Sequence, residues 1–452
     1  MGIKTRKAVL RILTILLIVI TVILAARAVF NYTLGRKLQA AIKQAKADGI
    51  PVSSWDLGPA CTEQENGAPL WRAAEALFAV SKDPETSSAL KAVENLYSGS
   101  PIGEVSRAEI LPWIARNRRV LGLIADASAM RCFRFDPPGK RSLDKYFPDS
   151  KKLIQAIRLI ALDSVFRAES GDIAGALDEC RQGLRFINKF SESDCSFLIN
   201  DLLAIYARKL LLTSFNRIIQ GRAMESATLS GWIDEFDEAE WRRQFAAGVR
   251  NDGVFTLEYG MAFISGGREI EEGVFPWQHA WSRFANWMKR PLLKSQVIEN
   301  MAVHRRLESI YPLPYHLQRA QFDKMRTESD ELPWYKKPLG QFVPNYQSAF
   351  LKEASLEALA LAAKAGLACR IFRNQHGRYP DSLDALVPEI LDKVPIDPFT
   401  GRRLIYRLSS EEVLIYSLGS NEKDDGGRQT ASFTQLVMEK DDDWSWREKI
   451  QS

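Results

Sequence analysis

The 452-residue sequence predicts a mainly α-helical protein with one transmembrane helix at its N-terminus and a small α+β module near its C-terminus. Three observations lead to this fold class. A continuous apolar segment lies near the N-terminus, apolar residues recur at helical spacing through most of the chain, and strand-like segments follow residue 400. With 46% hydrophobic and 10% aromatic residues, the chain can bury cores in two or three domains.

The predicted membrane helix lies in residues 1–30. No charge interrupts residues 12–26, and Arg11 and Arg27 bracket a length that spans a bilayer if both side chains reach the headgroups. Cleavage as a signal peptide is the alternative, because residues 26–28 have the small-x-small form of a cleavage site. The length of the apolar run favours retention as an anchor.

Basic residues stand on both sides of the apolar run, so the count of positive charges does not fix its orientation. A charged N-terminus precedes the run, however, and a large region follows it. This order predicts that the chain crosses the membrane once and that residues 31–452 lie outside the cytoplasm. The net charge of +5 comes without a basic run or a nucleic-acid-binding motif, so nucleic acid is not an expected partner.

Residues 31–250 are predicted to form an α-helical domain. The membrane helix should continue to Ala47 and end at residues 49–51, which contain Gly and Pro. Apolar stripes on both sides of residues 170–172 predict one antiparallel hairpin of the tetratricopeptide type. A repeat array would place another turn 34 residues later, but Ile205 at that distance lies within a further helix.

Residues 251–345 are rich in aromatic residues and prolines and predict a helical or irregular connector. Four apolar side chains share one predicted helix face with cations nearby: Trp277, Trp281, Phe284 and Met288. This pattern fits a helix lying on the membrane surface, while core packing is the commoner origin of such a stripe. Residues 431–452 are predicted to be a C-terminal tail.

Residues 346–430 predict the α+β module. A helix with an apolar stripe ends at Gly377, and Pro380 then leads into a short second helix. Two strands at 404–407 and 413–417 follow, and a loop rich in Asn, Asp and Gly comes after them. The predicted arrangement is a helix packed on a small antiparallel sheet.

Three motifs follow one another in this module: His376-Gly377-Arg378-Tyr379-Pro380, Val394-Pro395-Ile396-Asp397-Pro398, and Ser417-Leu418-Gly419-Ser420-Asn421. In this order, residues 354–427 resemble the C-terminal globular domain of the major type II secretion pseudopilin. The resemblance covers less than a fifth of the chain. It implies the fold of the module, a bacterial inner-membrane location and a link with secretion or pilus-like assembly. The N-terminus lacks a pseudopilin leader and the glutamate of its hydrophobic helix, which argues against polymerisation into a pseudopilus.

The loop after the second strand contains the predicted ion site. Asn421, Asp424 and Asp425 offer hard oxygen ligands within five residues, which suits calcium, and the resemblance implies calcium in the corresponding loop. The loop is not an EF-hand, because Lys423 takes its third position and Ser432 its twelfth. The alternative is that these residue types simply form a tight, solvated turn.

The five cysteines have no metal-ligand spacing: Cys61, Cys132, Cys180, Cys195 and Cys369. In an oxidising compartment they could form one or two disulfides and leave at least one free thiol. The alternative is that they are small buried hydrophobic residues.

No nucleophile elbow, phosphate-binding loop or zinc-protease motif occurs, and the four histidines lack ligand spacing. Enzymatic activity is therefore the less favoured interpretation. The sequence favours a structural or protein-interaction role at the cell envelope, with the membrane and envelope proteins as partners. The alternative is an extracytoplasmic hydrolase or ligand-binding protein whose site is assembled from residues distant in sequence.

Overall fold

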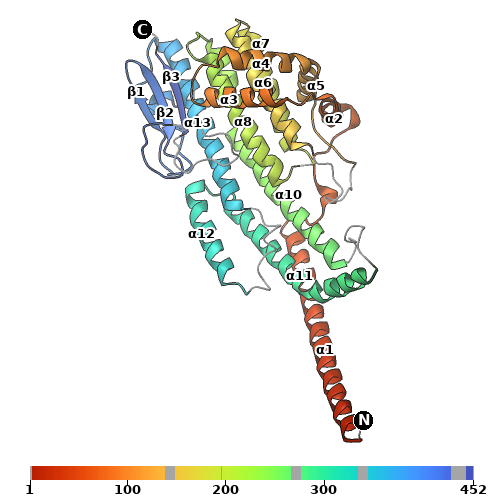
Figure 1. The fold of residues 1–452 in the computed structure, drawn as a ribbon. Helices are drawn as coiled ribbons and strands as arrows, with labels where there is room; N and C mark the ends of the chain where they lie inside the picture. Colours follow the sequence, from red (N-terminus) through yellow and green to blue (C-terminus); the bar gives the residue numbers. More distant parts are fainter. Residues whose placement is uncertain are drawn as a thin grey trace.

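The computed structural model describes residues 3–137, 148–194, 196–265, 276–333, 345–428 and 444–450. Within these ranges the chain is mainly helical and ends in a small antiparallel sheet, so the predicted class is confirmed at this level (Figure 1). One helix projects from the rest of the molecule, which we call the head (residues 31–450).

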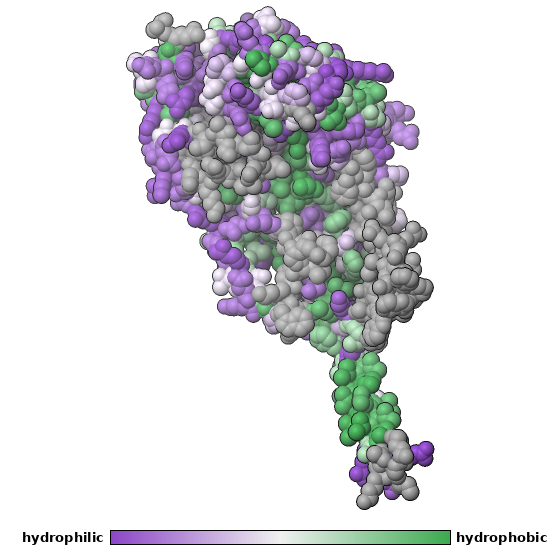
Figure 2. All heavy atoms as spheres, viewed as in Figure 1, coloured by the Kyte–Doolittle hydropathy of each residue, from purple (hydrophilic) through white to green (hydrophobic). Residues whose placement is uncertain are grey.

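Helix α1 (Ile3–Ala47) contains the predicted membrane segment and continues without a break into the head. It is long and apolar enough to cross a membrane. Its projecting half leaves large apolar side chains in the open, as the green surface in Figure 2 shows, and Leu10 and Leu17 are 67% and 65% exposed. Such exposure is costly in water but favourable in hydrocarbon. The helix ends just before Gly49, as the sequence predicts.

The upper half of α1 packs against α11 (Pro276–Ile310), which in turn packs against α10 (Glu238–Ser265). One residue of α1, two of α10 and one of α11 form a small core: Leu38, Leu257, Ile264 and Val297. Burying a side chain of this size contributes about 1.5–3 kcal/mol. The upper half of α1 is therefore a structural part of the head, continuous with the candidate membrane span.

The predicted connector, residues 251–345, is mainly helical where it is described, because the end of α10, α11 and α12 (Tyr315–Glu331) occupy it. Met288, from the predicted membrane-surface face, is 37% exposed. The other three side chains of that face lie outside the part of the chain that the structure describes: Trp277, Trp281 and Phe284.

The remaining helices of the head before α10 are α2 (Ala68–Leu77), α3 (Asp83–Tyr97), α4 (Glu104–Arg116), α5 (Arg118–Ala129), α6 (Ser150–Glu169), α7 (Ile173–Ser191), α8 (Leu198–Ile219) and α9 (Ser226–Glu235), with 3-10 turns at Ser54–Asp56 and Glu63–Glu65. The hairpin predicted around residues 170–172 is α6 and α7. Helices α4 and α5 are separated at Asn117, whose side-chain amide bonds the backbone N–H and C=O of Ala79 at 2.9 and 3.0 Å.

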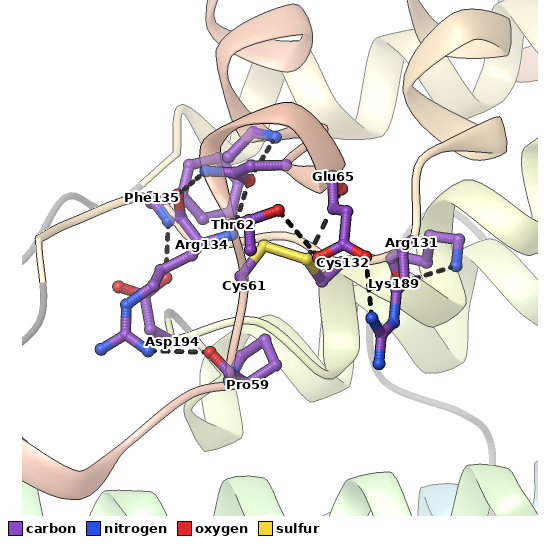
Figure 3. Close-up of a disulfide and its surroundings, with 12 residues drawn as sticks. Pro59, Cys61, Thr62, Glu65, Arg131, Cys132, Arg134, Phe135, Lys189 and Asp194 are labelled. Carbon is purple, nitrogen blue, oxygen red and sulfur yellow. Dashed lines mark hydrogen bonds and ion pairs between the residues drawn. A yellow bond between two sulfur atoms is a disulfide. The ribbon is translucent and has the colours of Figure 1, made fainter.

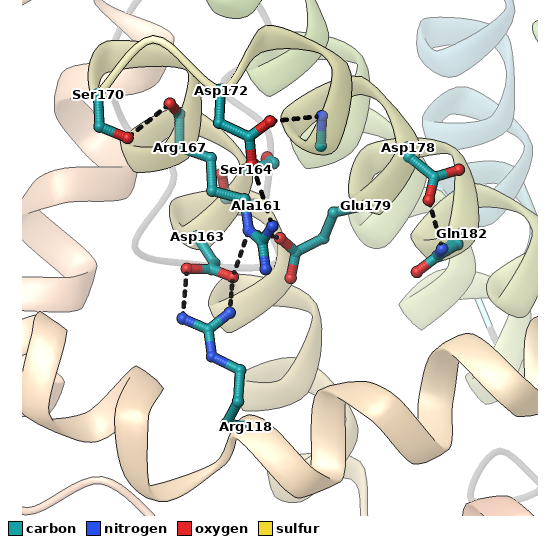
Figure 4. A network of polar contacts seen from close by, with 11 residues as sticks. Arg118, Ala161, Asp163, Ser164, Arg167, Ser170, Asp172, Asp178, Glu179 and Gln182 are labelled. Atoms are coloured by element: carbon teal, nitrogen blue, oxygen red, sulfur yellow. Dashed lines mark hydrogen bonds and ion pairs between the residues drawn. The ribbon is translucent and has the colours of Figure 1, made fainter.

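A buried charge network holds the α6–α7 hairpin to α5 (Figure 4). Asp163 accepts hydrogen bonds from Arg118 at 3.2 Å and from Arg167 at 3.1 Å, and Arg167 also pairs with Glu179 at 2.8 Å. Burial, together with the neighbouring Asp163, raises the pKa of Glu179 to about 9. Glu179 therefore carries a proton at neutral pH, which lets it approach Asp163 without repulsion.

A disulfide between Cys61 and Cys132 joins the segment before α2 to the segment after α5 (Figure 3). The backbone of the same two segments is also bonded, since Gly67 N–H donates to Cys132 C=O at 2.9 Å. Cys180 and Cys369 are buried thiols. The two interpretations of the cysteines thus each apply to part of the set, and Cys195 lies outside the described residues.

Helix α13 (Tyr346–His376) is followed by a 3-10 turn (Leu383–Leu386) and by strands β1 (Ile405–Leu408), β2 (Glu412–Ser417) and β3 (Trp444–Lys449). The strands pair antiparallel in the order β1-β2-β3, and β2 and β3 pack on α13. Gly366 permits this close approach, because a Cβ there would lie 2.2 Å from Trp446 Nε1.

Two features of this C-terminal region differ from the prediction. Part of the expected tail (residues 431–452) forms the third strand of the sheet. Trp446 of this strand is buried against α13, and this packing stabilises the strand. Helix α13 also packs on α8, α9 and α10, so the module shares its core with the rest of the head. Its many alanines allow neighbours to approach from several sides.

Loss of the disulfide should destabilise the protein by about 4 kcal/mol, because the crosslink closes a loop of 71 residues and restricts the unfolded chain. We expect Cys61→Ser, Cys132→Ser and the double variant to lose the same free energy of unfolding, measured by urea unfolding of the full chain in detergent. Two single losses that add up in the double variant would show that the cysteines are not bonded to each other.

Candidate ligand-binding site

A cavity of about 160 Å³ lies between α1, α10 and α11, where α1 enters the head. Most of its wall is apolar and comes from these helices and the segment after α1: Ala41, Ala45, Ile50, Pro51, Val52, Leu257, Ile298 and Met301. The site therefore depends on α1, since the wall on that side consists of α1 and the residues that follow it.

Charged side chains of α10 and α11 line another part of the cavity wall. Arg250 forms a two-pronged pair with Glu308, with N–O distances of 2.6 and 2.8 Å. Arg305 pairs with Asp48, beyond the end of α1, at 3.2 Å. Because each cation has a carboxylate partner, the wall gains polarity with little net charge. It thus suits a molecule with an apolar part and an uncharged or weakly polar end.

His304 of α11 also lines the cavity and begins a chain of hydrogen bonds leading into the head. The Tyr346 hydroxyl, at the start of α13, lies 3.0 Å from His304 Nε2 and donates to Asp252 Oδ2 of α10 at 2.9 Å. Three helices far apart in sequence thus meet at one polar point. Gly253 leaves room for it, because a Cβ there would lie 2.7 Å from His304 Nδ1.

The protonation states of this chain follow from its burial. Burial lowers the pKa of His304 to about 4, so the imidazole is neutral at pH 7. Burial raises the pKa of Asp252 to about 6, against the hydrogen bond from Tyr346, which favours the carboxylate. At neutral pH the Tyr346 hydroxyl therefore donates to a carboxylate, and the tautomer of the neutral imidazole sets the direction of its hydrogen bond with Tyr346.

The described lining of the cavity contains no Ser, Thr or Cys. The neutral His304 could accept or deliver a proton, but the described wall supplies no nucleophile that it could activate for acyl transfer. The arrangement can therefore bind and orient a polar group of a ligand. It does not form the Ser–His–Asp geometry of a hydrolase.

A second set of buried charges lies between α8 and α13, away from this cavity. Lys209 and Glu353 are 1% and 5% exposed. Burial lowers the pKa of Lys209 well below its usual range and raises that of Glu353 to about 8. Close packing on all sides makes these residues part of the core.

The predicted ion-site residues share one loop but have different contacts. Asp424 accepts from the Tyr416 hydroxyl at 2.8 Å and pairs with Arg407 at 2.7 Å, while Asn421 donates to Asp425 at 2.9 Å. The bond from Tyr416 is the largest of the effects that hold the pKa of Asp424 below its usual value. Calcium binding by Asn421, Asp424 and Asp425 stays a prediction, in which the ion would compete with Arg407 for Asp424.

No local signal in the sequence predicted the His304 chain. Its members lie on three helices, and neither Asp252 nor Tyr346 is within 40 residues of His304. The absence of ligand spacing among the histidines excludes a local metal motif, but it carries no information on contacts between distant helices. The cavity was equally hidden, because its wall joins the end of the membrane helix to residues more than 200 positions later.

Replacing Asp252 with Asn should change how stability depends on pH. In the wild type the raised pKa of Asp252 means that stability falls as pH rises from about 4 to about 6. His304, with its lowered pKa, contributes the opposite slope in both proteins. Asp252→Asn should therefore gain up to about 3 kcal/mol over the wild type across this range. Urea unfolding of the full chain in detergent measures the difference, and parallel stability curves would contradict it.

Comparison of the chain with protein-family models, curated proteins and solved structures gave no match in any of the three. The geometry of the cavity and its polar wall therefore carries the functional interpretation.

Proposed function

We propose that this chain is a membrane-anchored binding protein of the bacterial cell envelope, and that its head holds a small, partly apolar molecule in the cavity between α1, α10 and α11. The mainly apolar cavity with His304 at its wall is the observation that carries the proposal. A cavity of roughly this size, about 150 Å³, accommodates a benzene-sized group. The apolar part of the ligand should therefore have about six carbon atoms, with its polar end toward His304.

Two features support an extracytoplasmic head on a retained anchor. The Cys61–Cys132 disulfide fits an oxidising compartment, where such bonds form and persist. The packing of Leu34 and Leu38 of α1 inside the head favours retention over cleavage, because removal of residues 1–28 would cut the helix shortly before its buried part.

Protein interaction at the envelope, linked with secretion or pilus-like assembly, is the second candidate function. One observation favours it. Among the described residues β1 pairs with β2 alone, so its other edge can accept a strand from a partner, and Leu408 on it is 43% exposed. Capture of secretion components by cross-linking in intact cells would support this candidate, and recovery of the protein alone would contradict it.

Filling the cavity should abolish ligand binding. Ala41 lines the cavity, so Ala41→Leu places a larger side chain inside it, whereas Ala47→Leu makes the same change at an exposed position of α1. We would titrate hexan-1-ol and hexanoate onto the full chain in nanodiscs and follow the melting temperature. At tenfold excess over Kd, the wild type and Ala47→Leu should gain about 1.4 kcal/mol and Ala41→Leu nothing. No response of the wild type to either probe, or an equal response of all three proteins, would overturn the proposal.

A further inference from the structure

A groove of about 660 Å³ lies at the lower end of the head, between α1, the end of α10 and α11. Its lining combines apolar or aromatic side chains with cations: Tyr32, Leu38, Met261 and Ile264 on one hand, Arg36, Lys43 and Lys294 on the other. This groove is separate from the ligand cavity, which is lined by other residues of α1, Ala41 and Ala45.

Lys294 of α11 is the central cation of the groove. Its ammonium donates to the backbone C=O of Asn31 at 3.2 Å, which fixes it beside α1. No carboxylate of the described residues lies within ion-pair distance of Lys294, Arg36 or Lys43. Elsewhere in the head, arginines such as Arg250 and Arg305 have carboxylate partners, so among the described residues the groove differs in holding cations without a carboxylate partner.

Further cations border the same place. Arg27, the last charge of the membrane segment, stacks on Trp287 of α11, with its guanidinium carbon 3.3 Å from the ring centroid. Burial lowers the pKa of Lys294, and Arg290 and Arg27 lower it further by repulsion. An anion bound between these side chains would offset that repulsion and favour the charged form of Lys294.

The position of the groove points to the source of the anion. The apolar segment ends near Phe30, and an α-helix rises 1.5 Å per residue, so Asn31 to Gly35 extend to about 7.5 Å beyond it. That depth corresponds to the headgroup layer, which adds about 5–8 Å to each side of the hydrocarbon core. Tyr32, Met261 and Ile264 can then contact the glycerol and the first acyl carbons of a lipid.

From this geometry we propose that the groove binds the phosphate-bearing headgroup of an anionic phospholipid, with Lys294 and Arg36 as its principal contacts. The site would fix the height and rotation of the head at the membrane surface. It does not depend on the ligand proposed for the cavity, since the two share no lining residue.

The test uses the full chain in nanodiscs of phosphatidylcholine, with or without phosphatidylglycerol, and native mass spectrometry to count retained lipids. Lys294→Gln and Arg36→Gln each remove a groove cation. Lys37→Gln removes an exposed cation beside Arg36 on α1 that does not line the groove. The wild type and Lys37→Gln should retain phosphatidylglycerol preferentially, and each groove variant should lose about fivefold in apparent affinity for it.

Melting temperatures in pure phosphatidylcholine identify any variant that fails to fold. If Lys294→Gln does not fold, Arg36→Gln still tests the proposal, because Arg36 is exposed. Equal losses in Lys37→Gln and the groove variants would overturn the proposal, because general surface charge would then explain lipid retention. Inorganic phosphate added to phosphatidylcholine discs is the second arm. Stabilisation by free phosphate without preference for the anionic lipid would also overturn it.

Discussion

The packing of the upper half of α1 against α11 is the contact on which the rest of this structure depends. Leu34 and Leu38 are buried there at 7% and 2% exposure, and a helix without a break carries them from the membrane segment into the head. A flexible linker would let the head move freely over the bilayer. Here the candidate membrane span and the head share one helix, so the orientation of one fixes that of the other. The cavity and the cationic groove both take one wall from this helix.

The polar chain from His304 through Tyr346 to Asp252 links this lower bundle to the C-terminal region. It joins α10 and α11 to the first turn of α13, and α13 carries the sheet. Burial keeps the histidine neutral and opposes ionisation of the carboxylate. A change at the cavity wall could therefore reach α13 through two hydrogen bonds. An apolar contact would also hold the helices together, but it would not set the protonation states of His304 and Asp252.

Local signals in the sequence predicted the elements that local physics determines. The Gly- and Pro-containing residues 49–51 end α1, residues 170–172 separate α6 from α7, and the run of apolar and aromatic residues within 413–417 forms β2. The third strand was missed, because Trp444–Lys449 is short, follows an acidic run and gains its reason from α13, far away in sequence. The cavity and the His304 chain were missed for the same reason. Tertiary packing brings their residues together, and no sequence spacing predicts such contacts between distant helices.

Hydrogen–deuterium exchange of the full chain in nanodiscs tests most directly whether α1 is built into the head. The structure predicts that the amides of residues 31–47 exchange as slowly as those of residues 294–305 of α11, because the two segments pack together and should open together. Fast exchange of residues 31–47 beside a protected α11 would contradict the account. Such a result would make the segment a free linker and remove one wall from both the cavity and the groove.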